Sequence, residues 1–264
     1  MSSFNPKVYW ENRLEEAFGL SGVGYTGLGN NYNKWLYKVR RIVFLDKMKS
    51  IAHDFSKAMV LDVGCGTGFY FERWKELGTE KIVGIDIANI AIEKLTEQYP
   101  EGEFYQMDIG ANIEGIASLK FDFVSAFDVL FHIVDDTQYE KAICNIYSLL
   151  NPGGFFVWSD NFLHKETLRA EHQVCRRLNS ISAILISTGF QIVERCPMFY
   201  LMNAPVDSRN RFLEILWRII RLGVSRSEFA GLAIGGFLYP FELVLTSLAN
   251  EGPSTEIMIC RRPI

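Results

Sequence analysis

The chain has 264 residues, with 27 Lys and Arg against 31 Asp and Glu, so its formal net charge is 27 − 31 = −4. Hydrophobic residues make up 48% of the sequence and charged residues 22%, proportions that exclude intrinsic disorder as the main state. The acidic balance argues against broad nucleic-acid binding, which needs a dense arrangement of Lys and Arg.

The chain shows no sign of export or of membrane insertion. Its N-terminal segment, MSSFNPKVYWENR, lacks the apolar core of a secretory signal, and the apolar run over 229–241 is short for a membrane span. The cysteines are scattered without a CxxC pair, which favours neither a disulfide framework nor a zinc cage. They are Cys65, Cys144, Cys175, Cys196 and Cys260. We therefore expect a soluble, cytoplasmic protein.

Three zones follow one another along the chain. Residues 1–57 predict an N-terminal helical cap, in which a Gly-rich loop over 21–33 precedes a helix with apolar residues at three- and four-residue spacing. Residues 58–200 alternate β-rich and helical runs, which predicts a doubly wound, mostly parallel α/β sheet. The expected strands cover 59–64, 81–87, 103–109, 122–127, 155–160 and 191–196, and NPGG at 151–154 predicts a helix stop followed by a turn.

The last zone is mostly helical. Residues 208–223 predict a basic amphipathic helix, and an apolar helix follows to about residue 249. We expect residues 201–254 to be a helical lid or insertion and 255–264 to return as a closing strand of the core. The basic helix could serve as a lid, as a dimer contact or as a membrane-surface helix.

The most informative stretch is VLDVGCGTGF at 60–69. A buried strand runs into Gly64, Gly66 and Gly68 at alternate positions, and a helix then begins near Phe69. Glycines let the backbone turn sharply and let a ligand lie against bare main chain. Because open α/β sheets bind ligands at the carboxyl ends of their strands, this loop predicts a ligand site.

Acidic residues follow at the tips of the next two strands. Asp86 lies 86 − 68 = 18 residues beyond the last loop glycine, where a carboxylate can accept hydrogen bonds from both hydroxyls of a ribose. Asp108 could accept from an adenine amine while Ile109 covers the ring. Together with Asp62 they suit a positively charged nucleoside better than a polyphosphate, and the G-x-G-x-G spacing differs from the dinucleotide fingerprint.

These motifs resemble the class I S-adenosylmethionine-dependent methyltransferases over roughly residues 58–200. VLDVGCGTG, Asp86, Asp108, FDFVSAFDVLFHI and LLNPGGFFV occur in the family's order and spacing. The resemblance implies a Rossmann-like, seven-stranded sheet whose last strand inserts between the fifth and sixth. It also implies S-adenosyl-L-methionine as cofactor. The implied cofactor-binding residues are Tyr9, Trp10, Asp62, Gly64, Cys65, Gly66, Gly68, Asp86, Ile87, Asp108, Ile109 and Phe127.

Two of the implied roles have a plain structural alternative. Tyr9 and Trp10 resemble an aromatic pair that closes over the cofactor, where a ring face attracts a sulfonium, but they could simply pack a helix onto the core. His132, after the fourth strand, is the candidate general base for a hydroxyl acceptor, and it could instead only order its loop.

Acceptor contacts are expected at the end of the fifth strand and beyond. Asp160, His164, His172 and Arg176 are the candidates, with Asn161 and Arg169 beside them. Positions 169, 172 and 176 predict one face of a helix, which could bind an acceptor or only be solvated. Asp135 and Asp136 could be metal ligands beside Asp160, but adjacent loop acids are commonly plain surface, and we predict no metal.

The sequence therefore predicts methyl transfer to a small-molecule or glycan acceptor, at oxygen because the chain lacks an Asn/Asp-Pro-Pro-Tyr motif after the fourth strand. A lipid-linked or hydrophobic acceptor, a non-catalytic cofactor-binding subunit and a nicotinamide oxidoreductase stay open. We expect no nucleic-acid partner and no transmembrane segment, with peripheral membrane contact left open, in a monomer or homodimer.

Overall fold

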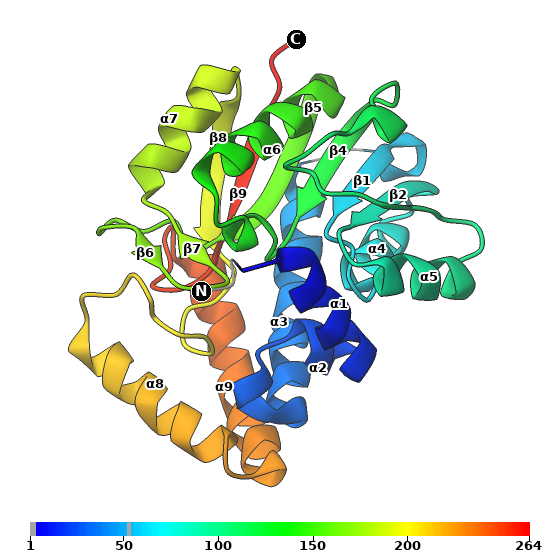
Figure 1. Cartoon of the computed structure of the whole chain (residues 1–264). Coiled ribbons are helices and arrows are strands. Elements are labelled where there is room, and N and C mark those ends of the chain that lie inside the picture. The colour runs from blue at the N-terminus through cyan, green and yellow to red at the C-terminus, as the bar shows by residue number, and fades with distance from the viewer. Residues whose placement is uncertain (1–3, 52–53) are drawn as a thin grey trace. The chain divides into compact units, whose positions relative to one another are not determined.

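The computed structural model describes residues 4–51 and 54–264, and its centre is a seven-stranded sheet in the order β3-β2-β1-β4-β5-β9-β8 (Figure 1). β1 pairs in parallel with β2 and with β4, β2 pairs in parallel with β3, and β4 with β5. The strands are β1 (Met59–Val63), β2 (Lys81–Asp86), β3 (Glu103–Gln106), β4 (Phe121–Ala126), β5 (Leu150–Asp160), β8 (Gln191–Pro197) and β9 (Glu256–Arg261). The doubly wound, mostly parallel sheet is confirmed, and the closing strand β9 lies between β5 and β8 as the resemblance implies.

Some helices alternate with these strands along the chain, and the others lie before the first strand or before the last one. They are α1 (Pro6–Glu16), α2 (Leu20–Val23), α3 (Gly29–Ser50), α4 (Phe69–Glu76), α5 (Asn89–Gln98), α6 (Asp136–Leu149), α7 (Leu178–Thr188), α8 (Arg211–Val224) and α9 (Glu228–Leu248). A small hairpin of β6 (Leu168–Arg169) and β7 (Val174–Cys175) is separate from the main sheet. Most predicted strands differ from the observed ones by a residue or two, but β3 ends at Gln106, three residues before the predicted end.

The predicted turn at 151–154 is wrong. α6 ends at Leu149 as the helix stop implies, but the chain enters β5 at once and runs to Asp160. A register shift against β4 lies in this segment, because Phe121 pairs with Leu150 whereas Phe123 pairs with Phe155. A left-handed Gly153, with φ of 83°, accommodates the extra residues. The glycines thus form a bulge within a strand.

The two faces of the sheet are covered by different helices. Alternate residues of β1, such as Leu61 and Val63, join a buried apolar cluster that includes side chains of α6 and α7. The opposite face of the sheet carries Ser125, whose hydroxyl accepts a hydrogen bond from the indole of Trp74 on α4 at 3.0 Å. The period of two along the strands therefore places the apolar cluster on one face and the Ser125 hydroxyl on the other.

The chain divides into two compact units. One contains the described residues 4–15, 54–194 and 258–264, and therefore α1 and most of the sheet. The other contains residues 16–51 and 195–257, and therefore α3, α8 and α9. This division differs from the boundaries expected at 57 and 200, because the first helix of the predicted cap groups with the sheet and the second groups with the C-terminal helices.

Glycines and one buried carboxylate hold the helical unit together. A Cβ atom added at Gly235 of α9 would lie 2.3 Å from Trp35 of α3, and one added at Gly231 would lie 3.2 Å from the Tyr32 backbone, so only glycine allows these two helices to approach so closely. The buried carboxylate of Glu242 accepts hydrogen bonds from the backbone N–H groups of residues 200–202 at 2.7, 2.7 and 3.2 Å. α9 is thereby fixed to the segment that follows β8.

Candidate functional site

The loop between β1 and α4 has the strained geometry that its glycines predict. Gly64, Gly66 and Gly68 have φ angles of 67°, 50° and 82°, in the left-handed region that side chains rarely adopt. The N–H groups of Gly64 and Cys65 donate to the Ile85 carbonyl at 2.7 and 3.0 Å, which ties the loop to β2. A Cβ atom at Gly64 would lie 2.3 Å from the Val129 side chain, so this position has room for glycine alone.

Asp86, the last residue of β2, binds the loop through a hydrogen bond. Its Oδ2 accepts the Gly66 N–H at 2.9 Å, and its Oδ1 accepts the Ala88 N–H at 2.9 Å. Burial raises the pKa of the Asp86 carboxyl, and these backbone donors oppose the shift. Because a carboxylate has about four lone-pair sites, it retains acceptor capacity for further donors. The sequence-predicted pairing of the glycine loop with this strand tip is therefore present.

Asp62 lies under the loop in a buried polar network. The Ser125 hydroxyl donates to its Oδ1 at 2.8 Å, and Trp74 donates to the Ser125 hydroxyl. Burial raises the pKa of Asp62 to about 7, with the Ser125 hydrogen bond opposing the shift and the charge of Asp86 adding to it. Two carboxylates near one loop favour a ligand that carries positive charge.

The remaining predicted cofactor residues occupy mixed environments. Asp108 lies beyond the end of β3 and accepts the Gly110 N–H at 2.8 Å. Ile109 belongs to the buried apolar cluster, and Phe127 stacks on Tyr70 with ring centroids 4.0 Å apart. Ile87 is partly exposed after β2, so it is a more accessible apolar side chain than Ile109.

Glu11 is a site residue that the sequence reasoning did not single out. Its Oε2 accepts the Asn89 N–H at 2.7 Å and its Oε1 accepts the Ile90 N–H at 3.0 Å, at the start of α5. The Ala88 N–H is already held by Asp86, so three consecutive amides are bound by two carboxylates. A helix start exposes unpaired N–H groups and positive partial charge, which explains the pairing. In the sequence, its position directly after Tyr9 and Trp10 is the feature that could have identified Glu11.

Glu11 anchors α1 so that the aromatic pair reaches the histidines. Trp10 meets the ring of His132 edge-on at 4.9 Å, and Tyr9 stacks on His172 at 5.7 Å. The Arg13 guanidinium lies 5.0 Å from the centre of the Trp10 ring. Both predicted aromatics therefore contact site residues, and α1 connects the start of α5 with the loop after β4.

His132 is held in one tautomer. It ends a short 3₁₀ helix (Leu130–His132), and its Nδ1 lies 2.8 Å from the His172 carbonyl oxygen. Because a carbonyl only accepts, Nδ1 carries the proton and Nε2 keeps its lone pair. Burial lowers the pKa of His132 to about 4, although the hydrogen bond to the carbonyl opposes the shift. The imidazole is therefore neutral at pH 7 and able to accept a proton at Nε2.

Asp160 ends β5 as a fully buried carboxyl. Its Oδ1 accepts the Asn161 N–H at 2.6 Å, whereas no residue of the described chain donates to its Oδ2. Burial raises the pKa of Asp160 to about 7, and the Arg176 charge opposes the shift. His164 lies exposed beyond this strand end.

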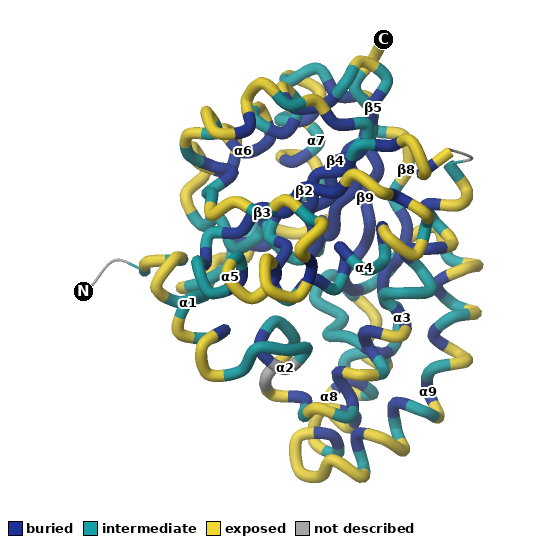
Figure 2. Tube along the Cα trace, turned by 90° about the vertical axis from the view of Figure 1, so that its right-hand side faces the viewer, coloured by how far each residue is buried: buried dark blue, intermediate teal, exposed yellow. Residues whose placement is uncertain are grey.

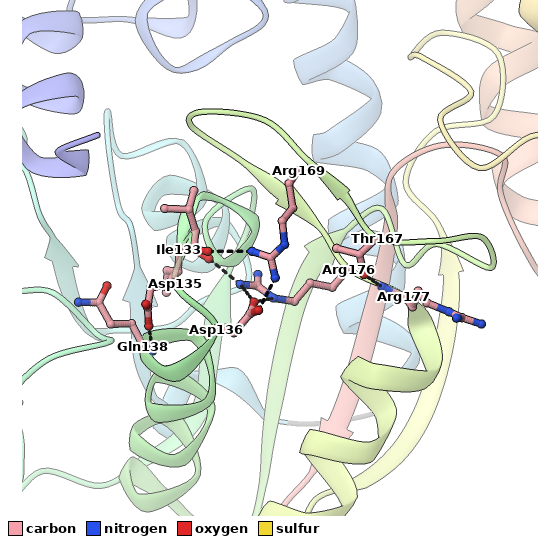
Figure 3. A network of polar contacts seen from close by, with 9 residues as sticks. Ile133, Asp135, Asp136, Gln138, Thr167, Arg169, Arg176 and Arg177 are labelled. Carbon is pink, nitrogen blue, oxygen red and sulfur yellow. Dashed lines mark hydrogen bonds and ion pairs between the residues drawn. The ribbon is translucent and has the colours of Figure 1, made fainter. Parts of the chain in front are cut away.

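The predicted helical face of 169, 172 and 176 is wrong, because these residues belong to the β6–β7 hairpin and its flanks. Arg176 is buried, and two of its nitrogens contact Asp136 Oδ1 at 3.0 and 2.8 Å (Figure 3). Arg169 reaches the other oxygen of Asp136 from the exposed side. The Arg176 guanidinium also lies 3.9 Å from the centre of the Tyr139 ring. Arg176 thus ties the hairpin to the start of α6.

The two adjacent acids after the fourth strand have separate structural partners. Asp135 caps α6 by accepting the Gln138 N–H at 2.8 Å, and Asp136 pairs with the two arginines (Figure 3). The Asp135 contact is a helix N-cap, and the Asp136 contacts are ion pairs. The candidate site contains the glycine loop, Asp86 and α1, and Trp10 of α1 contacts His132.

Known proteins share the domain that carries this site. Residues 60–154 match a family model described as a methyltransferase domain. The chain is 28% identical over 142 residues to the mRNA cap guanine-N(7) methyltransferase of Caenorhabditis briggsae, covering 48% of this chain and 37% of the relative. It is 30% identical over 149 residues to an O-methyltransferase of Aspergillus nomiae, covering 51% of this chain and 65% of the relative. The chain thus spans less than two thirds of either relative.

The fold has close parallels among solved structures. The N-methyltransferase NodS from Bradyrhizobium japonicum, solved in complex with S-adenosyl-L-homocysteine, superimposes with a TM-score of 0.57. The alignment covers 99% of this chain and 100% of NodS at 14% sequence identity. At that identity, the likeness concerns the fold.

Proposed function

We propose that the chain, whose residues 60–154 match a methyltransferase domain, is a class I S-adenosylmethionine-dependent methyltransferase and that it methylates an oxygen atom of a small-molecule or glycan acceptor. One observation carries the proposal: the Gly66 N–H is bound by Asp86, which joins the bare loop to the strand tip where a ribose would lie. This contact supports a site in which Asp86 recognises the nucleoside beside the bare main chain of the loop.

The residues present fit this cofactor, which supplies a methyl group on a positively charged sulfur. The Asp86 carboxylate keeps lone pairs that can accept hydrogen bonds from ribose hydroxyls. Asp108 uses its Oδ1 to accept the Gly110 N–H, so its Oδ2 could accept from an adenine amine. Asp62 adds negative charge beneath the loop, which suits an ammonium or sulfonium group. The left-handed glycines leave the main chain uncovered for the ligand.

His132 supports the choice of oxygen over nitrogen. A hydroxyl acceptor must lose its proton during transfer, and a neutral imidazole with a free Nε2 lone pair can take that proton. The hydrogen bond from Nδ1 to the His172 carbonyl fixes the ring orientation that such a base needs. Trp10 packs edge-on against the same ring.

Acceptor selection is proposed to involve Asp160 and the residues after β5. Asp160 has a buried carboxyl oxygen without a donor in the described chain, and such a group gains from a hydroxyl that donates to it. His164 is exposed nearby in sequence, whereas Arg176 is already engaged with Asp136. The net charge of −4 disfavours an RNA acceptor such as the one in the relative's name.

Transfer of a radiolabelled methyl group to a panel of acceptors tests this function. The panel contains sugars, phenols, lipid-linked sugars, amines and a capped RNA oligonucleotide. Label in an ether product of a sugar or phenol supports the proposal, and label only in an amine or in RNA contradicts it. Binding of S-adenosylhomocysteine without label in any acceptor would favour a non-catalytic binding subunit.

A further inference from the structure

Two helices of the second unit expose many large apolar side chains. α8 and α9 carry ten of them, and the exposed fraction reaches 78% for Phe229 and 76% for Leu248. We call these residues the apolar surface: Phe212, Ile215, Ile219, Leu222, Phe229, Leu232, Phe237, Phe241, Val244 and Leu248. Exposed segments alternate with buried ones along both helices in Figure 2. Apolar exposure on this scale marks an interaction site.

The exposed side chains of α8 form a stripe of their own. Phe212, Ile215, Ile219 and Leu222 recur at three- and four-residue spacing, which places them along one side of the helix. A different side of α8 is buried through Trp217, Ile220 and Val224. The buried side of α8 already packs inside the protein. The exposed stripe is a second apolar side, which has no partner among the described residues.

α9 shows the same division. Phe237, Phe241, Val244 and Leu248 share one exposed side, whereas Gly235, Leu238, Glu242 and Thr246 are buried on another. Residues 228–248 contain two charged side chains, and both have backbone partners. Glu228 accepts the N–H groups of Asn30 and Asn31 at 2.7 Å each, and Glu242 accepts those of residues 200–202. The exposed side of α9 therefore consists of apolar side chains.

Positive charge lies beside this apolar surface. Residues 209–226 contain five arginines against one acid, Glu214, although the whole chain has a net charge of −4. All five arginines are exposed: Arg209, Arg211, Arg218, Arg221 and Arg226. On a helical projection Arg211 and Arg218 lie together at one edge of the exposed stripe of α8. Arginine next to exposed aromatic and aliphatic residues is the composition of helices that lie on anionic lipid surfaces.

We propose that α8 and α9 form a docking surface for an anionic lipid bilayer, with the apolar surface entering the acyl boundary and the arginines contacting lipid phosphates. The charge distribution favours lipid over a second copy of this chain. A two-fold dimer through α8 would bring the arginines of one copy toward those of the other, with Glu214 as the one acid in the segment to balance them. Anionic lipid would instead neutralise the arginines that border the stripe, Arg211 and Arg218.

The contacts of α9 favour the bilayer surface over its interior. By length and composition alone, α9 could cross a membrane. However, Glu242 holds three backbone N–H groups, and the Trp35 indole donates to the Leu232 carbonyl at 3.1 Å. A spanning α9 would carry this carboxyl and its partners into hydrocarbon at high cost. The proposal does not rest on methyl transfer.

Cosedimentation of the full chain with vesicles tests the proposal. One set of vesicles is pure phosphatidylcholine and the other contains 30% phosphatidylglycerol, as a working choice of about one anionic lipid in three. The wild type is compared with Phe237→Ser/Phe241→Ser and with Arg211→Gln/Arg218→Gln. The matched controls are Ile186→Ser, at an exposed apolar position of α7, and Lys94→Gln/Lys141→Gln on other helices. Circular dichroism and thermal melts establish that each variant is folded.

We expect binding to the anionic vesicles alone at moderate salt, weakened by added salt. Removing two arginines should lower the partition coefficient about thirtyfold, from roughly 1 kcal/mol per charge, and the two-Phe variant by at least about tenfold. The controls should bind like the wild type. Failure of the wild type to bind, or equal binding by all variants, would overturn the proposal. So would a concentration-dependent dimer that the two-Phe variant abolishes without any lipid binding, because the surface would then be a contact between copies.

Discussion

The carboxylate of Glu11 accepts the N–H of Asn89 at 2.7 Å, so a residue of the first helix caps a helix that begins 78 positions later. The Ile90 N–H donates to the second oxygen of the same carboxylate. This contact fixes the position of the two residues that precede Glu11, Tyr9 and Trp10. The predicted aromatic cover is thereby joined to the amides that follow Asp86.

Replacing Glu11 by Gln tests that anchor. The amide oxygen can still accept one N–H, but its NH₂ group faces the other N–H, and the negative charge at the start of α5 is lost. We expect faster hydrogen exchange over residues 6–16 and about tenfold weaker binding of S-adenosylhomocysteine, near 1.4 kcal/mol. Glu15→Gln, an exposed acid on the same helix, is the control. Equal behaviour of the two variants would show that Glu11 has no anchoring role.

Replacing His132 by Asn separates its hydrogen bond from its basicity. The Asn amide can still donate to the His172 carbonyl, but it has no nitrogen that takes a proton at neutral pH. Turnover should fall about a hundredfold or more, while affinity for S-adenosylhomocysteine stays within about twofold. Near-normal turnover would remove His132 from the catalytic residues.

The same histidine makes the free energy of unfolding depend on pH. Its pKa is about 4 in the folded state and near 6.5 in the unfolded state, so the unfolded chain binds more protons between these values. Its contribution to the free energy of unfolding is complete above pH 6.5 and is lost as the pH falls toward 4. Urea melts of the wild type and His132→Asn across this window should diverge, with the wild type losing more stability.

Asp62 should show the opposite pH dependence. Its folded pKa of about 7 lies above the unfolded value, so ionising the buried carboxyl lowers stability as the pH rises from about 4 to 7. Asp62→Asn should raise the free energy of unfolding at pH 8, by at most about 4 kcal/mol at 1.36 kcal/mol per pKa unit. That gain should disappear near pH 4, and cofactor affinity should fall above pH 7, where the wild-type carboxyl is charged. A gain that is equal at both pH values would refute the assigned cause.

Two arginines contact one carboxylate, so substituting each in turn compares the effect of burial on stability. Arg176 and Arg169 both contact Asp136, but their side chains are 5% and 51% exposed. Arg176→Lys loses the forked contact and the stacking on Tyr139 in a buried place, which should cost roughly 2–4 kcal/mol. Arg169→Lys should cost less than about 0.5 kcal/mol in chemical denaturation. Equal costs would show that burial does not decide the strength of this network.

The sequence predicts those parts of the fold that local patterns determine. The apolar runs at 59–64 and 81–87 become β1 and β2, and the spacing of Gly64, Gly66 and Gly68 yields left-handed turns because each φ angle demands glycine. Asp86 can be placed at the loop from its position at a strand tip.

Distant contacts decide what the sequence did not predict. The spacing of 169, 172 and 176 resembles a helix, but Asp136, more than thirty positions earlier, holds Arg169 and Arg176 in a hairpin. Residues 16–51 group with 195–257 through pairs such as Asn30 and Glu228, which no local pattern reveals. The contact of Glu11 with α5 is likewise between residues far apart in the sequence, so no local pattern reveals it.

Calorimetric titration of S-adenosylhomocysteine and of NADH into the same preparation tests the cofactor site most directly, with Asp86→Ala measured beside the wild type. We expect one molecule of S-adenosylhomocysteine bound per chain, no heat from NADH, and affinity roughly ten- to a hundredfold weaker in Asp86→Ala through lost hydrogen bonds of about 1–3 kcal/mol. Binding of NADH in place of S-adenosylhomocysteine, or equal affinity in the variant while its thermal melt shows it folded, would contradict the site at Gly66 and Asp86.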